Sequence, residues 1–251
     1  MPIQGLVGYG GGATAFTTGA SSTTKSYSVF FDGDNDYVTF ADNAAYASGT
    51  GDFCVEVWCK LASTGVYQNI LNTREASGTE NGWTFSRETD GTVGFYDSGH
   101  VFSSAGNIAL NTWTHILVQR KSSVIRMMVD GVLRGYATSI TNNYSNNLFT
   151  IGINCAGPDD PGSAEGWVEG YLSNVRYVVG SVPTTYQTSE TSLGTTCFTV
   201  PTENLTTTSQ GADSDDVVFL GLNAKSVDSV TKSSSTMTVS GATGGHDGPF
   251  N

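Results

Sequence analysis

The sequence predicts an all-β fold, a two-sheet antiparallel sandwich or jelly roll, and two observations carry that prediction. Of the 251 residues only 14% are charged and 38% hydrophobic, whereas 31 are glycine, which suits short strands joined by polar turns. Short apolar or alternating runs recur at regular spacing, with turn residues between them. No convincing amphipathic helix is present, apart from a turn or two around residues 43–47.

The strands are expected in chain order from Tyr27 onward. SYSVFF and DYVTFA flank an aspartate turn, and hairpins are expected across residues 89–90 and 121–123, with a further turn at Asp130-Gly131. The other strands are predicted in DFCVEVWCKL (52–61), VYQNILN (66–72), GWTFSRE (82–88), GTVGFYD (91–97), WTHILVQR (113–120), VIRMMVDG (124–131), VLRGYATS (132–139), LFTIGIN (148–154), WVEGYLSNVRYVV (167–179), DVVFLGL (216–222) and TMTVSG (236–241).

Alternation assigns faces to two of these strands. In residues 52–61, Cys54, Glu56 and Trp58 face one side, and Val55, Val57 and Cys59 face the other. The Glu56 carboxylate beside a bulky ring must therefore find a polar partner. In residues 113–120, Ile116 and Val118 oppose a face shared by Trp113, His115, Leu117 and Gln119.

The first 25 residues differ from the rest, and we divide the chain into an N-terminal arm, residues 1–25, and one sandwich domain, residues 26–251. The arm is rich in Gly, Ser and Thr and shows neither strand nor helix periodicity. It is either an unstructured tail or an arm that lies on a partner and adds its backbone to a sheet edge. The apolar residues of such an arm are Leu6, Val7, Tyr9 and Phe16. A Thr- and Ser-rich connection, residues 181–215, is expected on the surface.

The net charge of −12 argues against nucleic acid and anionic membranes as partners, because both need clustered Lys and Arg. No apolar run approaches the roughly 18–20 residues that span a bilayer, and the start of the chain lacks the pattern of a secretory signal. Cys54 and Cys59 face opposite sides of one strand and cannot pair. With Cys155 and Cys197, they are expected as reduced thiols of a protein made in a cytoplasm.

Five stretches, in this order, carry a resemblance to a known family: SVFFDGDNDYVTF, GTGDFCVEVWCKL, NTWTHILVQRKSSVIRMMVDGVLRG, LFTIG and GYLSNVRYVVG. Residues 26–180, which contain them, resemble the concanavalin A-like, laminin-G-like jelly-roll superfamily. When the Thr- and Ser-rich connection of residues 181–215, the stretch DVVFLGLNAKSVDSV and the final PF are included, the chain is similar to laminin-G-like virion structural proteins of marine tailed phages. It departs from that group in two places: the connection lacks a proline run, and VVFLGLNAKS replaces a leucine-cysteine-glutamine turn.

Asp32, Asp34 and Asp36 are either turn residues or calcium ligands. An EF-hand loop counted from Asp32 would need glycine sixth and glutamate twelfth, where the chain has Tyr37 and Asn43. Asp-Gly-Asp-Asn-Asp between two strands is turn chemistry. The resemblance implies that a calcium ion can bind near the sandwich rim, with these three carboxylates as its candidate ligands, but that the ion is not required. No cofactor is required for folding, since a chain of this length buries roughly 70–75% of its unfolded surface.

Catalysis is not expected. Laminarinase-like enzymes of the superfamily carry Glu-x-Asp-x-x-Glu on one strand, and the sequence lacks that pattern. Glu165 and Glu169 come nearest: they are four positions apart and could share a strand face, but each is equally interpreted as a rim residue. GxSxG is absent, His100 and His246 are placed in turns, and His115 lies inside an apolar strand.

Carbohydrate binding without catalysis is the other open hypothesis. Four aromatic residues are expected near turns or strand ends, where jelly-roll lectins place their sites: Trp83, Tyr96, Tyr144 and Trp167. The alternative for each is a place in the core or at an interface.

The resemblance implies a non-enzymatic phage virion structural protein, a capsid decoration or a tail or fibre component. It would be assembled in the host cytoplasm and attached through its arm to other virion proteins or to its own copies. The alternative is a receptor-recognition or adhesion lectin that binds a cell-surface glycan.

Overall fold

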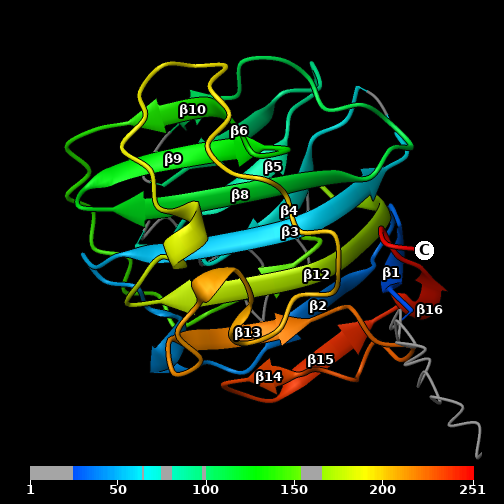
Figure 1. Cartoon of the computed structure of the whole chain (residues 1–251). Helices are drawn as coiled ribbons and strands as arrows, with labels where there is room; N and C mark the ends of the chain where they lie inside the picture. The colour runs from blue at the N-terminus through cyan, green and yellow to red at the C-terminus, as the bar shows by residue number, and fades with distance from the viewer. Residues whose placement is uncertain (1–24, 64, 75–80, 98–99, 154–165) are drawn as a thin grey trace, which may run out of the picture.

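The computed structural model describes residues 25–63, 65–74, 81–97, 100–153 and 166–251, which form two packed antiparallel sheets (Figure 1). The helical elements in these ranges are 3-10 turns of three residues each: η1 (Ala44–Tyr46), η3 (Thr184–Tyr186) and η4 (Ser209–Gly211). The predicted two-sheet sandwich is therefore confirmed. Within the described ranges, no helix is long and apolar enough to cross a membrane.

The strands of the larger sheet, sheet A, lie in the spatial order β10 (Val132–Ala137), β9 (Val124–Val129), β8 (Thr114–Lys121), β3 (Phe53–Leu61), β12 (Glu169–Val179), β1 (Tyr27–Asp32) and β16 (Thr243–Asp247). It branches at β12, which also pairs with β13 (Val217–Gly221), and β13 pairs with β14 (Lys232–Ser233). The smaller sheet, sheet B, has the order β15 (Met237–Ser240), β2 (Tyr37–Phe40), β11 (Thr150–Ile151), β4 (Gln68–Asn72), β5 (Thr84–Arg87), β6 (Val93–Tyr96) and β7 (His100–Ser103).

Two histidines lie in strands that the sequence did not predict. The expectation that His100 and His246 occupy turns is wrong, because His100 begins β7 and His246 pairs with Ser28 across β16 and β1. β16 has the sequence TGGHD, and two glycines lower its intrinsic strand propensity. Pairing with a neighbouring strand, which local sequence does not reveal, forms it.

The main core lies between the two sheets, where the predicted alternation is confirmed. Val55 and Val57 of β3 and Ile116 and Val118 of β8 are fully buried in this core. Each such side chain contributes roughly 1.5–3 kcal/mol by leaving water. The opposite residues of the same strands, among them Glu56, point to the outer face of sheet A.

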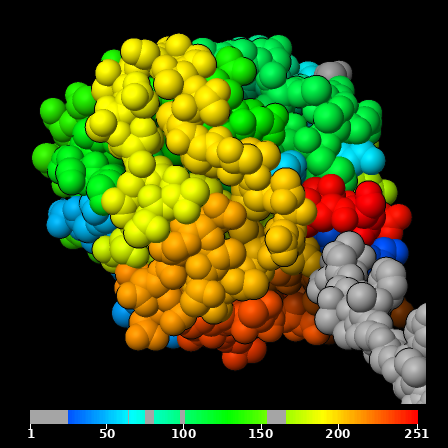
Figure 2. Space-filling model, viewed as in Figure 1, coloured from blue at the N-terminus to red at the C-terminus, as the bar shows by residue number. Residues whose placement is uncertain are grey.

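A third layer covers part of that outer face. The connection predicted for residues 181–215 runs across sheet A (Figure 1, yellow to orange) and buries a second apolar cluster beneath it. This cluster includes Cys54, Leu117, Met128, Leu133, Val178, Val182, Tyr186, Phe198, Leu205 and Leu220. We call residues 181–215 the connector. It is a surface segment, as predicted, and also a cover for the sheet (Figure 2).

The first described residues and the C-terminus lie side by side next to β16 (Figure 1). The Ser26 N–H donates to Asn251 Oδ1 at 3.0 Å, and Asn251 Nδ2 donates to the Ser26 carbonyl oxygen at 2.8 Å. Phe250 places its ring edge-on to Trp58 on the outer face, with centroids 5.4 Å apart. The arm residues Leu6, Val7, Tyr9 and Phe16 lie outside the described residues.

Candidate functional site

The aspartate turn between β1 and β2 is held by its own side chains. Asp36 Oδ2 accepts the Asp32 N–H at 2.9 Å, and Asp32 Oδ1 accepts the Asp34 N–H at 2.8 Å. Gly33 and Asn35 have φ angles of 87° and 65°, a conformation that glycine and asparagine tolerate best. The turn chemistry predicted from the sequence therefore accounts for this stretch.

Calcium binding by Asp32, Asp34 and Asp36 stays a prediction. The described residues contain no group of three or more His, Cys, Asp or Glu side chains placed to hold a metal ion. Asp36 is buried, and burial raises the pKa of its carboxyl, with a smaller contribution in the same direction from the Asp32 charge. The Asp32 N–H opposes this shift. All three carboxylates already serve as hydrogen-bond acceptors within the turn.

A pocket of about 250 Å³ opens beside this turn, and we call it the rim pocket. Its described lining consists of Gly33, Ser63, Val66, Tyr67, Gly166, Trp167 and Glu169. Strand pairing places Glu169, at the start of β12, opposite Asp32 at the end of β1. The Asn69 N–H donates to the Gly166 carbonyl at 2.7 Å, which ties the segment before β12 to β4 of sheet B. The rim pocket thus forms where the ends of both sheets meet.

Four partly exposed aromatic rings gather at this rim. Trp167 lies against Tyr37, with ring centroids 5.9 Å apart, and Tyr67 meets Tyr96 edge-on at 6.3 Å. Burial and the neighbouring Glu88 carboxylate raise the pKa of Tyr96, so its phenol is neutral. Aromatic faces beside a carboxylate and hydroxyl groups match the chemistry of sugar recognition. Sequence reasoning found Tyr96 and Trp167 but missed Tyr37, which directly follows the aspartate turn, and Tyr67.

The other two aromatic candidates are corrected by the structure. Trp83 is fully buried and stacks on Phe53, with centroids 5.5 Å apart and planes 2° from parallel. Tyr144 is buried too, and its hydroxyl donates to Asp97 Oδ2 at 3.2 Å. Both rings fill the core between the sheets, so neither has a face on which a sugar could stack. Glu165 lies outside the described residues.

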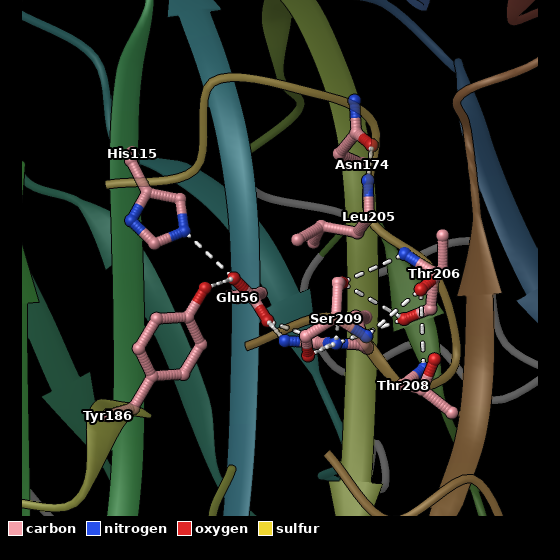
Figure 3. A network of polar contacts seen from close by, with 9 residues as sticks. Glu56, His115, Asn174, Tyr186, Leu205, Thr206, Thr208 and Ser209 are labelled. Carbon is pink, nitrogen blue, oxygen red and sulfur yellow. Dashed lines mark hydrogen bonds and ion pairs between the residues drawn. The ribbon is translucent and has the colours of Figure 1, made fainter. Parts of the chain in front are cut away.

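A second polar cluster lies beneath the connector, on the outer face of sheet A (Figure 3). Arg176 of β12 pairs with Glu56 of β3, its Nε 2.7 Å from Glu56 Oε1. Tyr186 of η3 donates its hydroxyl to Glu56 Oε2 at 2.7 Å, and His115 Nε2 lies 3.0 Å from the same oxygen. Arg176 Nη1 also donates to the backbone carbonyls of Thr206 and Ser209. We call Glu56, His115, Arg176 and Tyr186 the Glu56 network.

The Glu56 network is shielded from water, since Glu56 is 1% exposed and both Arg176 and His115 are 0% exposed. Burial alone would raise the pKa of Glu56, but the Arg176 charge and the hydrogen bonds from His115 and Tyr186 outweigh it and lower the pKa. A buried carboxylate held by three partners has no access to a substrate. The network therefore fixes the connector to the sheet, and it gives Glu56 the partner that the sequence required.

The outer face of sheet B carries a row of polar side chains, several of which form hydrogen bonds within the sheet. Thr39, Thr150, Asn72 and Thr84 pair in register across four strands and are buried. Asn72 Nδ2 donates to Thr150 Oγ1 at 3.2 Å, and Thr84 Oγ1 donates to the Leu71 carbonyl at 3.1 Å. Asn72 and Thr84 thus use their hydrogen-bonding groups within the sheet, whereas the rim pocket presents aromatic and polar side chains that are partly exposed.

Comparison with solved structures shows a likeness of fold. A protein from Bacteroides ovatus, described as a "putative carbohydrate binding protein", aligns with a TM-score of 0.61 and 12% identity over 90% of this chain and 62% of its own. The Ruminococcus gnavus IT-sialidase CBM40 bound to α2,3 sialyllactose aligns with a TM-score of 0.48 and 8% identity, over 62% of this chain and 90% of its own. This chain thus spans less than two thirds of the Bacteroides protein. A search of curated proteins found no match.

A family model also matches the sequence itself. Residues 32–178 match the model described as the concanavalin A-like lectin/glucanases superfamily, which covers more than half of the chain. The match includes the aspartate turn, Trp167 and most of both sheets. It leaves the narrower resemblance to phage virion proteins a prediction. The chain belongs to the concanavalin A-like lectin/glucanases superfamily.

Proposed function

We propose that this protein is a non-catalytic carbohydrate-binding module and that the rim pocket binds the sugar. The observation that carries the proposal is the partly exposed Trp167 ring in a pocket that also holds Tyr67, Glu169 and Ser63. The superfamily match and the fold shared with the Bacteroides ovatus protein support it.

The rim pocket supplies both kinds of contact that a sugar needs. The faces of Trp167 and Tyr67 can pack against the C–H groups of a pyranose ring, while Glu169 and Ser63 can bind its hydroxyls. The Glu169 N–H donates to Gln68 Oε1 at 2.9 Å, so β12 enters the pocket from a fixed position. A pocket fixed in advance reduces the ordering cost of binding.

Glycoside hydrolysis fits this pocket poorly. Most glycosidases place two carboxyl groups on either side of the scissile bond. Among the described residues that line the rim pocket, Glu169 is the one carboxylate. The buried Glu56 is committed to Arg176, His115 and Tyr186.

A glycan array followed by calorimetry with the best-bound oligosaccharide tests the proposal. Trp167→Ala should reduce affinity at least about tenfold, because a stacking face and its buried area are lost. Tyr136→Ala is the matched control, since Tyr136 is an exposed aromatic residue on β10 and does not line the rim pocket. Equal binding by wild type and Trp167→Ala, with Trp167→Ala normally folded, would contradict the proposal.

Virion attachment through the arm is a second proposal, which rests on the resemblance to phage structural proteins. One observation favours a tether at this end of the sandwich. The arm ends at residue 25, next to Tyr27 at the start of β1, whereas the rim pocket lies beside Asp32 at the end of β1. At the rise of a β-strand, Tyr27 and Asp32 are about 17 Å apart. A partner bound at the start of β1 would thus leave the rim pocket free. The edge strand β16, which accepts no partner beyond β1 among the described strands, lies there too.

Deletion of residues 2–20 tests that second proposal. The truncated chain should fail to enter virus particles and should keep the unfolding temperature of the full chain, because the sandwich starts beyond the deletion. Normal incorporation of the truncated chain would rule out attachment through the arm.

A further inference from the structure

We propose that the saccharide is anionic and that a second subsite, on the uncovered half of the outer face of sheet A, binds its carboxylate or sulfate group. This inference rests on the proposed function and names the class of ligand. The second subsite consists of Phe30, Lys60, Tyr171 and His246, and we call it the Tyr171 platform.

Strand register places three of these side chains in one row. Phe30 of β1 pairs with Tyr171 of β12, and Tyr171 pairs with Lys60 of β3. Their chain neighbours Val29, Leu172 and Cys59 are buried in the core between the sheets. Alternation therefore directs Phe30, Tyr171 and Lys60 to the outer face, where all three are partly exposed.

The row forms a ring surface with an ammonium group beside it. The Tyr171 ring centroid lies 5.1 Å from that of Phe30 and 5.4 Å from that of His246. Lys60 Nζ lies 5.8 Å from the Tyr171 ring centroid, within the range of a cation–π contact. A pocket of about 240 Å³ opens here, lined by Lys60, Tyr171, His246 and Asp247.

The local charge of this platform differs from that of the chain. The whole protein has a net charge of −12 and contains only 11 Lys and Arg residues. In the described lining of this pocket, by contrast, the one carboxylate is Asp247, and it is already paired with a lysine. Lys25 Nζ lies 2.8 Å from Asp247 Oδ1, and this hydrogen bond and the Lys25 charge lower the pKa of Asp247. Among the described residues, no carboxylate lies within ion-pairing distance of Lys60. Lys60 is thus available to an anion.

The Tyr171 platform and the rim pocket are both lined by residues of β12. Glu169 lines the rim pocket and Tyr171 the platform, and two residues on one face of a strand lie about 7 Å apart. One oligosaccharide could therefore stack on Trp167 at the rim and place an anionic group near Lys60. The connector, in yellow to orange, does not extend over the C-terminal residues, in red (Figure 2).

Binding of matched charged and neutral polymers tests the inference. The probes are polygalacturonate with its carboxyl-reduced form, and dextran sulfate with dextran. We expect Lys60→Met to weaken binding of the charged member of one pair about tenfold, the loss of one charge-assisted contact, and to leave its neutral partner unchanged. A loss with polygalacturonate identifies the bound group as a carboxylate, and a loss with dextran sulfate identifies it as a sulfate. Lys121→Met is the matched control, because it removes the same charge at the far end of β8, about 23 Å from the Thr114 end that adjoins Cys59.

The outcomes separate this inference from the proposed function. Neutral binding that needs Trp167, combined with no loss in Lys60→Met, overturns the anionic subsite and leaves the carbohydrate-binding module standing. Equal losses in Lys60→Met and Lys121→Met also overturn the subsite, because they show only a long-range charge effect. Absence of binding by any probe in the array and in these pairs overturns both.

Discussion

The outer face of sheet A has a closed half and an open half, and the same two strands run through both. Along β3 and β12 the paired residues are Cys54 with Val178, Glu56 with Arg176, Trp58 with Ser173, and Lys60 with Tyr171. The first two pairs lie under the connector and are buried, whereas the last pair is partly exposed. Trp58, covered by Phe250, marks the boundary.

Charge has a different role in each half. The closed half buries Glu56 with every partner it needs, so its charges hold the connector in place. The open half leaves Lys60 beside an aromatic ring, without a carboxylate partner among the described residues. A buried ion pair is strongly destabilising to break, whereas an exposed charge contributes little to folding. Substitutions should therefore change stability in the closed half and ligand binding in the open half.

The largest effect is expected from Glu56→Gln. This change leaves Arg176 buried without a counter-charge, and breaking such a pair costs about 3–5 kcal/mol. Urea unfolding should show the loss as a lower midpoint. Glu169→Gln, a partly exposed carboxylate on the neighbouring strand, is the matched control and should change the free energy of unfolding by less than about 0.5 kcal/mol. Similar values for the two variants would contradict the division into halves.

Tyr186→Phe should give a smaller loss from the same network. The variant keeps the packing of the ring on Phe198, whose centroid lies 4.5 Å away, but removes the hydroxyl that donates to Glu56. A hydrogen bond to a charged group contributes about 1.5–3 kcal/mol. In a Glu56→Gln background the same change should cost less, because the acceptor is then neutral. A double-mutant cycle measures this coupling, and additive losses would show that Tyr186 acts independently of Glu56.

Acid should weaken the closed half specifically. The Glu56 pKa is lower in the folded state than its ordinary value of 4.5, so the stability it contributes is present above about pH 4.5 and is lost as the pH falls through the folded-state pKa. The free energy of unfolding of the wild type should therefore drop more steeply on acidification than that of Glu56→Gln. Parallel pH profiles for the two proteins would contradict this assignment.

The smallest change in stability is expected from Lys60→Met in the open half. Lys60 is partly exposed, and surface charges away from a network change unfolding by about 0.5 kcal/mol or less. Thermal unfolding checks this expectation on the variant used for the binding measurements. A loss comparable with that of Glu56→Gln would show that Lys60 has a structural role.

Local pattern predicted most of the fold. Alternation in residues 52–61 correctly separated Val55 and Val57 from Glu56, because strand periodicity is a property of neighbouring residues. The role of the connector could not be predicted, since its Thr- and Ser-rich sequence is typical of any surface loop. The partner of Glu56 was equally hidden, because Arg176 lies 120 positions away and meets it only through the pairing of β3 with β12.

The aromatic residues of the candidate site were predicted in part, and the failures have a physical cause. Trp83 and Trp167 both stand near the start of a predicted strand, yet one is buried in the core and the other lines the rim pocket. An aromatic ring is suited to either place, and the sequence around it does not show which sheet packs above it. The Tyr171 platform was missed because Phe30, Lys60 and Tyr171 come from three separate strands.

A crystal structure with the oligosaccharide that binds best on the array would show directly where the sugar lies. We expect sugar density against Trp167 and Tyr67 in the rim pocket, with an anionic group directed toward Lys60. Density on the connector instead, for example in the pocket lined by Thr199, Pro201 and Gln210, would contradict it.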